Sequence, residues 1–429
     1  MSLSNNDNKT RAILSIAVVW LYYLFSYMAR VEPSVLTNDL MSDFKITAST
    51  VGLVISMMYI PYVAMQIPFG VILDKFGVRK IIVTCALLCS FGAYIFGSAE
   101  SVFQLQIGRF LVGLSSASAF ISCGKIAGDM FDKRYYSILM GIAMCMGCLG
   151  GIFGTSPIAY LVSIFGWRWT TYIISFSGIF VALLAFFGIS SNNMENNHQN
   201  KENKSDLLTG LKMMAKNPRS WILGLYGAIT YLPLSAIAEL WGVPFMEQRF
   251  NVSTKSAALS SIVIFIGFGL GGVVGAWVAE RINSYKKTII IFTIGVIISF
   301  AIALYSDNIG YTLCLIMMFL GGIFAGANTL AFTIAFHMVP KKYSGTSAGF
   351  LNMLIMSSGI IFQPLLGKLL DFFRNGMVND SGSPIYNLQM YRSTFFIVII
   401  SMFIAIILTF FIEDVRHSNS PSENNEHNS

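Results

Sequence analysis

Long apolar stretches separated by short polar segments repeat along the whole chain. Each stretch is long enough to cross about 30 Å of hydrocarbon as an α-helix, which rises 1.5 Å per residue. The pattern therefore predicts an all-α membrane protein with twelve membrane-spanning helices. The predicted spans are residues 12–37, 48–70, 80–98, 104–128, 137–162, 168–189, 220–246, 257–280, 288–305, 310–337, 344–370 and 392–412.

The longest polar interruption, residues 190–219, separates the first six spans from the last six. It opens with an Asn-rich stretch that cannot bury enough apolar surface to fold alone, which is typical of a linker. Its residues 207–216 favour an amphipathic helix on the membrane surface. The predicted regions are a cytoplasmic tail (1–11), a six-helix bundle (12–189), a cytoplasmic linker (190–219), a second six-helix bundle (220–412) and a disordered cytoplasmic tail (413–429).

The composition supports a membrane protein. Only 11% of the 429 residues are charged, compared with about 25% in an ordinary soluble protein, and 55% are hydrophobic. A soluble fold of this length would need far more surface charge, so soluble enzymes and binding modules are excluded. No Walker loop, metal-spaced ligand set or paired catalytic groups at membrane depth occur, so we expect no enzyme activity, no cofactor and no metal.

The positive charges indicate the topology. The formal net charge is +7, and 18 of the 28 Lys and Arg residues lie in the loops on the side of the two termini. The other side carries six, and cytoplasmic loops usually hold the excess. We therefore predict that both termini are cytoplasmic, and the basic balance gives no support for a nucleic-acid partner.

An internal repeat indicates that the two bundles are related. The loop at residues 70–80 returns 206 residues later at residues 276–286, with an acid, a base, an apolar residue and a Lys aligned. Asn283 replaces Gly77, where a left-handed backbone conformation is expected. We therefore predict two pseudo-symmetric halves, which in transporters meet around a site near the middle of the membrane.

The first copy of this loop carries the pattern Gly70-x-x-x-Asp74-x-x-Gly77-x-Arg79-Lys80. It resembles the cytoplasmic signature loop of the major facilitator superfamily, and the resemblance extends over nearly the whole chain. It implies a twelve-helix secondary transporter that works by alternating access. The loop would act as a latch against the opposite half; the alternative is a solvated loop that only sets topology. The implied gating residues are Gly70, Asp74, Gly77, Arg79, Lys80, Glu280 and Arg281.

Arg109-x-x-x-Gly113 in the fourth span resembles a second motif of the superfamily, associated with proton-coupled members. An Arg inside an apolar helix costs about 2.5–3.5 kcal/mol on insertion scales, so Arg109 is expected to face a cavity or a partner. Alternatively, it lies near enough to the outer end to reach the interface. The resemblance implies a coupling role for Arg109. The fifth span lacks the Gly-Pro-x-x-Gly-Gly core of drug-exporting antiporters, which argues against export.

A narrower resemblance rests on five segments: Tyr22-Tyr23, Arg30-x-x-Pro33-Ser34, Gln66-Ile67-Pro68-x-Gly70, Lys125 and residues 238–245. They are similar to the phagosomal-transporter-type branch of intracellular bacteria, whose members take up amino acids or nucleosides. This resemblance implies uptake of a small polar solute, preferably an amino acid, across a bacterial inner membrane. Uptake of a nucleoside or a dipeptide, and export of a drug or siderophore, are the alternatives.

Arg30 and Glu239 are candidate substrate ligands. Arg30 follows Arg11 by about 28 Å of helix, which places it at cavity depth in a long first helix. In a short one, it would sit at the outer rim with Asp39 or Glu32. Glu239 lies 209 residues after Arg30, so related halves would place the two opposite each other. The pair suits an amino acid, with its carboxylate on Arg30 and its ammonium on Glu239; alternatively, Glu239 carries the coupling proton.

Five more polar side chains in the spans complete the predicted binding set: Tyr27, Tyr59, Lys125, Asn328 and Gln363. Each has a structural alternative, because Lys can reach the interface, amides can join neighbouring helices and Tyr can belong to interfacial belts. The expected partners are a small-molecule solute, protons and the lipid bilayer, and the protein is expected to act as a monomer.

Overall fold

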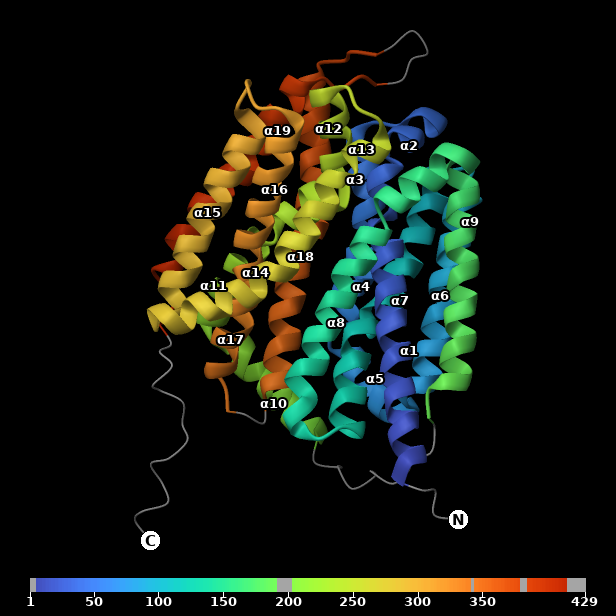
Figure 1. The fold of residues 1–429 in the computed structure, drawn as a ribbon, viewed down its shortest axis with the longest axis vertical. Coiled ribbons are helices and arrows are strands. Elements are labelled where there is room, and N and C mark those ends of the chain that lie inside the picture. Colours follow the sequence, from blue (N-terminus) through green and yellow to red (C-terminus); the bar gives the residue numbers. More distant parts are fainter. Residues whose placement is uncertain (1–4, 191–202, 341–342, 379–383, 415–429) are drawn as a thin grey trace.

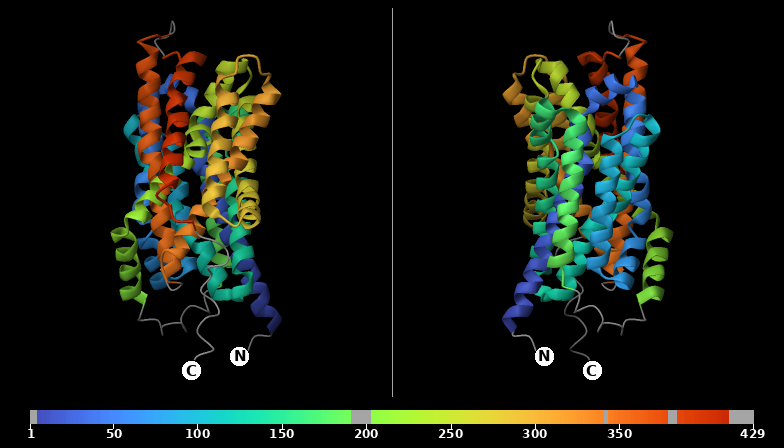
Figure 2. Two further views of the ribbon diagram at one scale, coloured as in Figure 1. Left: turned by 90° about the vertical axis from the view of Figure 1, so that its left-hand side faces the viewer. Right: turned by 90° about the vertical axis from the view of Figure 1, so that its right-hand side faces the viewer.

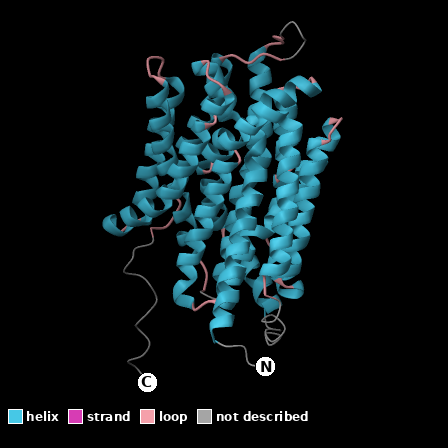
Figure 3. Cartoon of the chain, turned by 45° about the vertical axis from the view of Figure 1, so that its right-hand side comes forward, coloured by secondary structure: helices cyan, strands magenta, loops and turns pink. Residues whose placement is uncertain are grey.

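The computed structural model describes residues 5–190, 203–340, 343–378 and 384–414. Within these ranges the chain is helical apart from connecting segments and one isolated β-bridge between Val378 and Pro384 (Figure 3). The Asn-rich part of the predicted linker and the tail from residue 415 lie outside the described residues.

The first half of the chain builds six spans from ten helical segments. The second span is made of α3, α4 and α5, which are separated by short breaks. The segments are α1 (Asn5–Val31), η1 (Glu32–Val35), α2 (Thr37–Phe44), α3 (Ala48–Ser56), α4 (Tyr59–Met65), α5 (Pro68–Phe76), α6 (Val78–Gly97), α7 (Val102–Met130), α8 (Lys133–Phe153) and α9 (Ser156–Gly188).

The second half begins with α10 (Asn203–Lys216), a helix in the predicted linker that includes the expected amphipathic stretch. The seventh span joins α11, the π-helix η3 and α12, and the tenth joins α16, η4 and α17. The segments are α11 (Pro218–Thr230), η3 (Pro233–Trp241), α12 (Gly242–Phe250), α13 (Thr254–Ala257), α14 (Leu259–Ile282), α15 (Tyr285–Tyr305), α16 (Tyr311–Gly326), η4 (Ala327–Thr329), α17 (Leu330–His337), α18 (Ser344–Arg374) and α19 (Leu388–Thr409).

Eleven segments of the described chain are long and apolar enough to cross a membrane, and one of them is long enough to cross it twice. This segment, Arg134–Gly188, is 55 residues long and contains Gly166 with φ 77° and ψ 164°. Only glycine adopts such angles readily, so the chain reverses there and returns to the level of Ser15, which bonds the Gly188 carbonyl. The fifth and sixth predicted spans are thereby separated, and the predicted fold class is confirmed.

The helices run roughly along one common axis, and the start of α1 and the end of α19 point towards the same end of the bundle (Figures 1 and 2). We call this the terminal end and the other the distal end. Helices α5, α10 and α17 lie towards the terminal end, and α2, α12 and α13 towards the distal end (Figure 1). The repeated loops match in part: Gly77 and Asn283 both have positive φ, 81° and 53°. Asn283, with ψ 38°, adopts the expected left-handed helical conformation, whereas Gly77, with ψ 149°, does not.

The two halves touch unevenly along this axis. Their main contacts join α3 and α4 to α18, α8 to α14, and η1 to η3. At the distal end, a Cβ atom added to Gly52 or Gly367 would collide with the backbone of the opposite half. At the terminal end, a Cβ atom added to Gly70, Gly345 or Gly349 would meet no atom within 4 Å. The halves are therefore closely packed at the distal end, whereas these three terminal-end positions have open space around them.

Candidate functional site

An ion pair connects the two halves in the interior of the protein. Arg30 lies in the last turn of α1, and Glu239 lies in η3. Their guanidinium nitrogen Nη2 and carboxylate are 3.1 Å apart, and the side chains are only 4% and 2% exposed. Glu239 lies in a π-helix, and π-helical turns, although rare in proteins, are often found at functional sites. A buried charge at this depth requires its partner, so the two residues depend on each other.

Three tyrosine hydroxyls surround the Glu239 carboxylate. Tyr27 and Tyr231 donate hydrogen bonds to Oε1 at 3.1 and 3.0 Å, and Tyr59 donates one to Oε2. An ionised carboxylate accepts hydrogen bonds only, so four donors, including Arg30, satisfy its negative charge. Donors from both halves therefore hold the Glu239 carboxylate in place.

The Arg30 guanidinium is enclosed by aromatic rings. Its central carbon lies 5.0 Å from the ring centre of Tyr27, 4.9 Å from that of Tyr59 and 5.7 Å from that of Tyr62. Nη2 also contacts Met356 Sδ at 3.6 Å. Among the described residues, its buried Nε atom has no hydrogen-bond partner. Arg30 therefore retains a donor for a further acceptor, while cation–π contacts stabilise its charge.

Gln363 extends the cluster into α18. Its Nε2 donates to Tyr59 Oη at 3.2 Å and to the Ser235 carbonyl oxygen at 3.1 Å. Its buried Oε1 has no partner within the described part of the chain. Five of the predicted binding residues thus come together: Arg30, Tyr27, Tyr59, Glu239 and Gln363.

Tyr231 and Met356 also belong to this cluster and are not in the predicted binding set. The repeat offset relates Tyr231 to Tyr22, but Tyr22 bonds the Ser115 carbonyl oxygen at 2.7 Å, outside the cluster. The available signal for Tyr231 was its position on the same predicted span as Glu239. Met356 is apolar, and no sequence pattern marks it as a candidate binding residue.

Two predicted binding residues lie elsewhere. Lys125 Nζ is 2.7 Å from Asp74 Oδ1 and 3.2 Å from Asp129 Oδ2, so Lys125 is linked to the signature loop. Asn328 Nδ2 donates to the Gly227 carbonyl oxygen at 2.7 Å and to Thr230 Oγ1 at 2.8 Å, which joins η4 to α11. Neither contact includes Arg30 or Glu239.

Arg109 supports the helix that carries Arg30. It is 2% exposed, and its two terminal nitrogens each donate a 2.8 Å hydrogen bond, to the carbonyl oxygens of Ala29 and Arg30. The last carbonyls of a helix lack partners within it, and a cation there is favourable. Glu32, the alternative partner considered for Arg30, instead accepts a hydrogen bond from Thr171 at 2.6 Å.

The remaining signature-loop residues lie at the terminal end. Gly77 forms the turn between α5 and α6, and the Arg79 guanidinium lies 4.6 Å from the Phe186 ring centre. In the repeat of this loop at residues 276–286, the guanidinium carbon of Arg281 lies 5.5 Å from the ring centre of Trp277. Lys80 and Glu280 are exposed.

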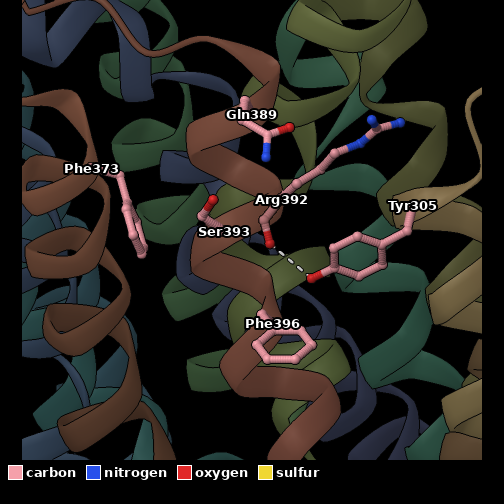
Figure 4. Close-up of a pocket in the computed structure, with 6 residues that line it drawn as sticks. All are labelled: Tyr305, Phe373, Gln389, Arg392, Ser393 and Phe396. Carbon is pink, nitrogen blue, oxygen red and sulfur yellow. Dashed lines mark hydrogen bonds between the residues drawn. The ribbon is translucent and has the colours of Figure 1, made fainter.

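A separate groove of about 430 Å³ lies on α19 between α15 and α18 (Figure 4). Its lining includes Arg392, whose Nε donates to the Leu304 carbonyl oxygen at 2.9 Å and whose Nη1 pairs with Asp307 at 2.5 Å. None of the predicted site residues lines it. Within the described residues, no cluster of three or more His, Cys, Asp or Glu side chains could hold a metal ion.

The sequence was compared with known families and proteins. A sequence model described as Major Facilitator Superfamily matches residues 18–364. The uncharacterized transporter YybO of Bacillus subtilis is 24% identical, over 81% of this chain and 85% of its own. The probable sulfoacetate transporter SauU of Cupriavidus necator is 22% identical, over 85% and 88%. The probable galactarate/D-glucarate transporter GudP of Escherichia coli is 22% identical, over 85% and 89%.

Solved structures share the fold. A bacterial homolog of the human lysosomal transporter Spinster, in an inward-facing and unoccupied conformation, has a TM-score of 0.78 at 15% identity, over 94% of this chain and 97% of its own. The nucleoside transporter NupG has a TM-score of 0.72 at 15% identity, over 94% and 99%. At this identity, the likeness concerns the arrangement of helices.

Proposed function

The chain belongs to the major facilitator superfamily and is a small-molecule transporter, and we propose that it takes up a carboxylate-bearing solute together with protons. An amino acid is the preferred solute. The observation that carries this proposal is the buried ion pair between Arg30 and Glu239 at the junction of the two halves. The membrane would be a bacterial inner membrane, with both termini cytoplasmic and the protein acting as a monomer.

Arg30 is the proposed anchor for the carboxylate. A guanidinium presents a planar fork that matches a carboxylate, and the buried Nε of Arg30 lacks a partner among the described residues. The named solutes of the relatives SauU and GudP, sulfoacetate and galactarate or D-glucarate, are also acids. This agreement supports an acidic group as the feature of the solute that Arg30 binds.

Glu239 is the proposed coupling residue because its negative charge balances the positive charge of Arg30, so the cluster has no net charge before a solute binds. A bound carboxylate adds a negative charge to a site where an unpaired charge costs several kcal/mol. The ammonium of an amino acid can restore the balance by pairing with Glu239, and a proton on Glu239 can do the same for an anion. Both routes use the same two residues, and both release Arg30 from Glu239.

The signature loop is the proposed gate at the terminal end. In the present state Asp74 pairs with Lys125, and Gly70 on α5 has open space around it. Gly345 in the first turn of α18 also has open space. Closing the terminal end would bring α5 onto this end of α18, where Gly70 permits close approach and Asp74 can cap free backbone N–H groups. Lys125 is thus assigned to the gate rather than to the solute.

Uptake into proteoliposomes tests the proposal. Radiolabelled amino acids, sugar acids and nucleosides are compared with and without an inward proton gradient. We expect saturable uptake of at least one carboxylate-bearing solute, stimulated by the gradient. Uptake restricted to nucleosides would overturn the carboxylate anchor and would favour the other solute class of the phagosomal-transporter-type branch. Equal uptake with and without the gradient, for every solute, would overturn proton coupling.

A further inference from the structure

Part of the signature-loop pattern also occurs on α18, in addition to the repeat at residues 276–286. We call this occurrence on α18 the second copy. Residues Gly70-x-x-Leu73-Asp74-x-Phe76 end α5, and residues Gly367-x-x-Leu370-Asp371-x-Phe373 stand at the end of α18. In both places the helix is followed by a residue with positive φ, Gly77 at 81° and Asn375 at 49°. The first copy lies at the terminal end of the second span, and the other at the distal end of the eleventh.

The acid of the second copy caps a helix of the opposite half. Helix α3 receives no side-chain cap from Thr47, the residue that precedes it. Instead, Ser49 N donates to Asp371 Oδ2 at 2.9 Å, and Ala48 N donates to Tyr386 Oη at 2.8 Å. Tyr386 in turn donates to Asp371 Oδ1. A carboxylate at a helix N-terminus satisfies free N–H groups and interacts favourably with the helix dipole.

The glycine of the second copy allows this contact. A Cβ atom added to Gly367 would collide with the carbonyl oxygen of Ala48, at the start of α3. Alanine at this position is therefore compatible with an isolated α18 but not with the closed distal end. By contrast, Gly70 in the first copy meets no atom within 4 Å, and its Asp74 pairs with Lys125 of its own half.

We propose that Gly367, Asp371 and Tyr386 form a distal latch that holds the two halves closed at the distal end. The latch is engaged in this structure, while the corresponding residues of the signature loop are released. The two copies act alternately, because rocking the halves brings one end together as it separates the other. This inference concerns the gate and does not depend on which solute is carried.

Distances across the distal end test the latch. Spin labels are attached to cysteines at Ser42 and Gln389, exposed distal residues of different halves, in a background without other cysteines. Pulsed electron paramagnetic resonance then gives the ratio of open to closed distal ends. We expect Asp371→Ala, which removes the acceptor for the Ser49 N–H group, to raise this ratio about fivefold, the usual effect of losing a helix cap. Gly367→Ala should make the open form predominant.

Two matched variants and a second label pair complete the experiment. Asp307→Asn removes another distal carboxylate, and Gly349→Ala alters a glycine of α18 that has open space; neither should raise the ratio. Labels at Tyr135 and His337, near the terminal end, should move closer in the latch variants, whereas misfolding would broaden both distributions. Unchanged distal distances in Asp371→Ala and Gly367→Ala, or an equal change in the controls, would overturn the latch.

Discussion

Arg109 donates a 2.8 Å hydrogen bond to the backbone carbonyl oxygen of Arg30. A second bond of the same length goes to Ala29, so one guanidinium holds the end of α1 from which the Arg30 side chain projects. We therefore propose that Arg109 sets the direction of the Arg30 side chain, in addition to the coupling role that the resemblance implies. The fork shape of guanidinium is essential to this role because two separate carbonyls are bound at once.

Replacing Arg109 with Lys should impair transport while retaining the positive charge. Lysine offers a point charge and cannot reproduce the two-pronged contact, so we expect uptake efficiency, Vmax/KM, to fall about tenfold, as for one lost charge-assisted bond. Arg168 provides the control, because it bonds the carbonyl oxygens of Gly97 and Ala99 at the end of α6, away from the cluster. An equal loss in Arg168→Lys would refute a specific role of Arg109.

Arg30→Ala and Glu239→Gln should each abolish uptake and also lower thermal stability. Each variant leaves the other charge buried without its partner, which costs about 3–5 kcal/mol. The double variant Arg30→Met with Glu239→Gln removes both charges, so its melting temperature should recover towards that of the wild type while uptake stays absent. Thermal unfolding and uptake, measured on the same preparations, separate the two effects. Uptake at the wild-type level in both single variants would contradict the proposed site.

Much of this site could be predicted because pseudo-symmetry preserves offsets along the chain. The repeat offset placed Glu239 opposite Arg30, and their side chains are 3.1 Å apart. The same offset relates Tyr231 to Tyr22, which bonds Ser115 outside the cluster, so pseudo-symmetry gives no reason to place Tyr231 beside Glu239.

Lys125 shows a different limit. Spacing along one helix relates Lys125 to Asp129, four residues later, and this contact is present at 3.2 Å. Its shorter contact is with Asp74, on another helix, and depends on how α5 packs against α7. Sequence spacing carries no information about that packing. The reversal at Gly166 was easier to anticipate, because Gly166 and Arg168 interrupt the apolar pattern.

The folded protein should become more stable in mild acid. At the distal end the pKa of Asp39 is raised to about 6, chiefly by burial and further by the carboxylates of Asp43 and Glu247. The folded state thus binds this proton more tightly than the unfolded chain, whose Asp pKa is about 3.9. Stability should therefore increase as the pH falls from about 6 towards 4, and the cost of the ionised group should be fully present above about pH 7.

Asp39→Asn tests this dependence through melting temperatures at pH 7.5 and 5.5. The variant should melt at a higher temperature than the wild type at pH 7.5 and should show a smaller difference between the two pH values. Asp307→Asn serves as the comparison, because its carboxylate is mostly exposed and pairs with Arg392. If Asp39→Asn keeps the full pH dependence of the wild type, the effect arises from another group.

Gly70→Leu should slow transport without destabilising the present state. A Cβ atom at this position meets nothing within 4 Å, so the side chain fits while the terminal end is separated. Closing that end would force the Leu side chain against α18, and overpacking costs about 1–3 kcal/mol, enough to lower turnover tenfold or more. Gly310→Leu is the matched control, since Gly310 also has open space but lies in the loop before α16. Uptake assays and melting temperatures of the two variants decide the matter: normal turnover in Gly70→Leu would show that the signature loop does not close against α18.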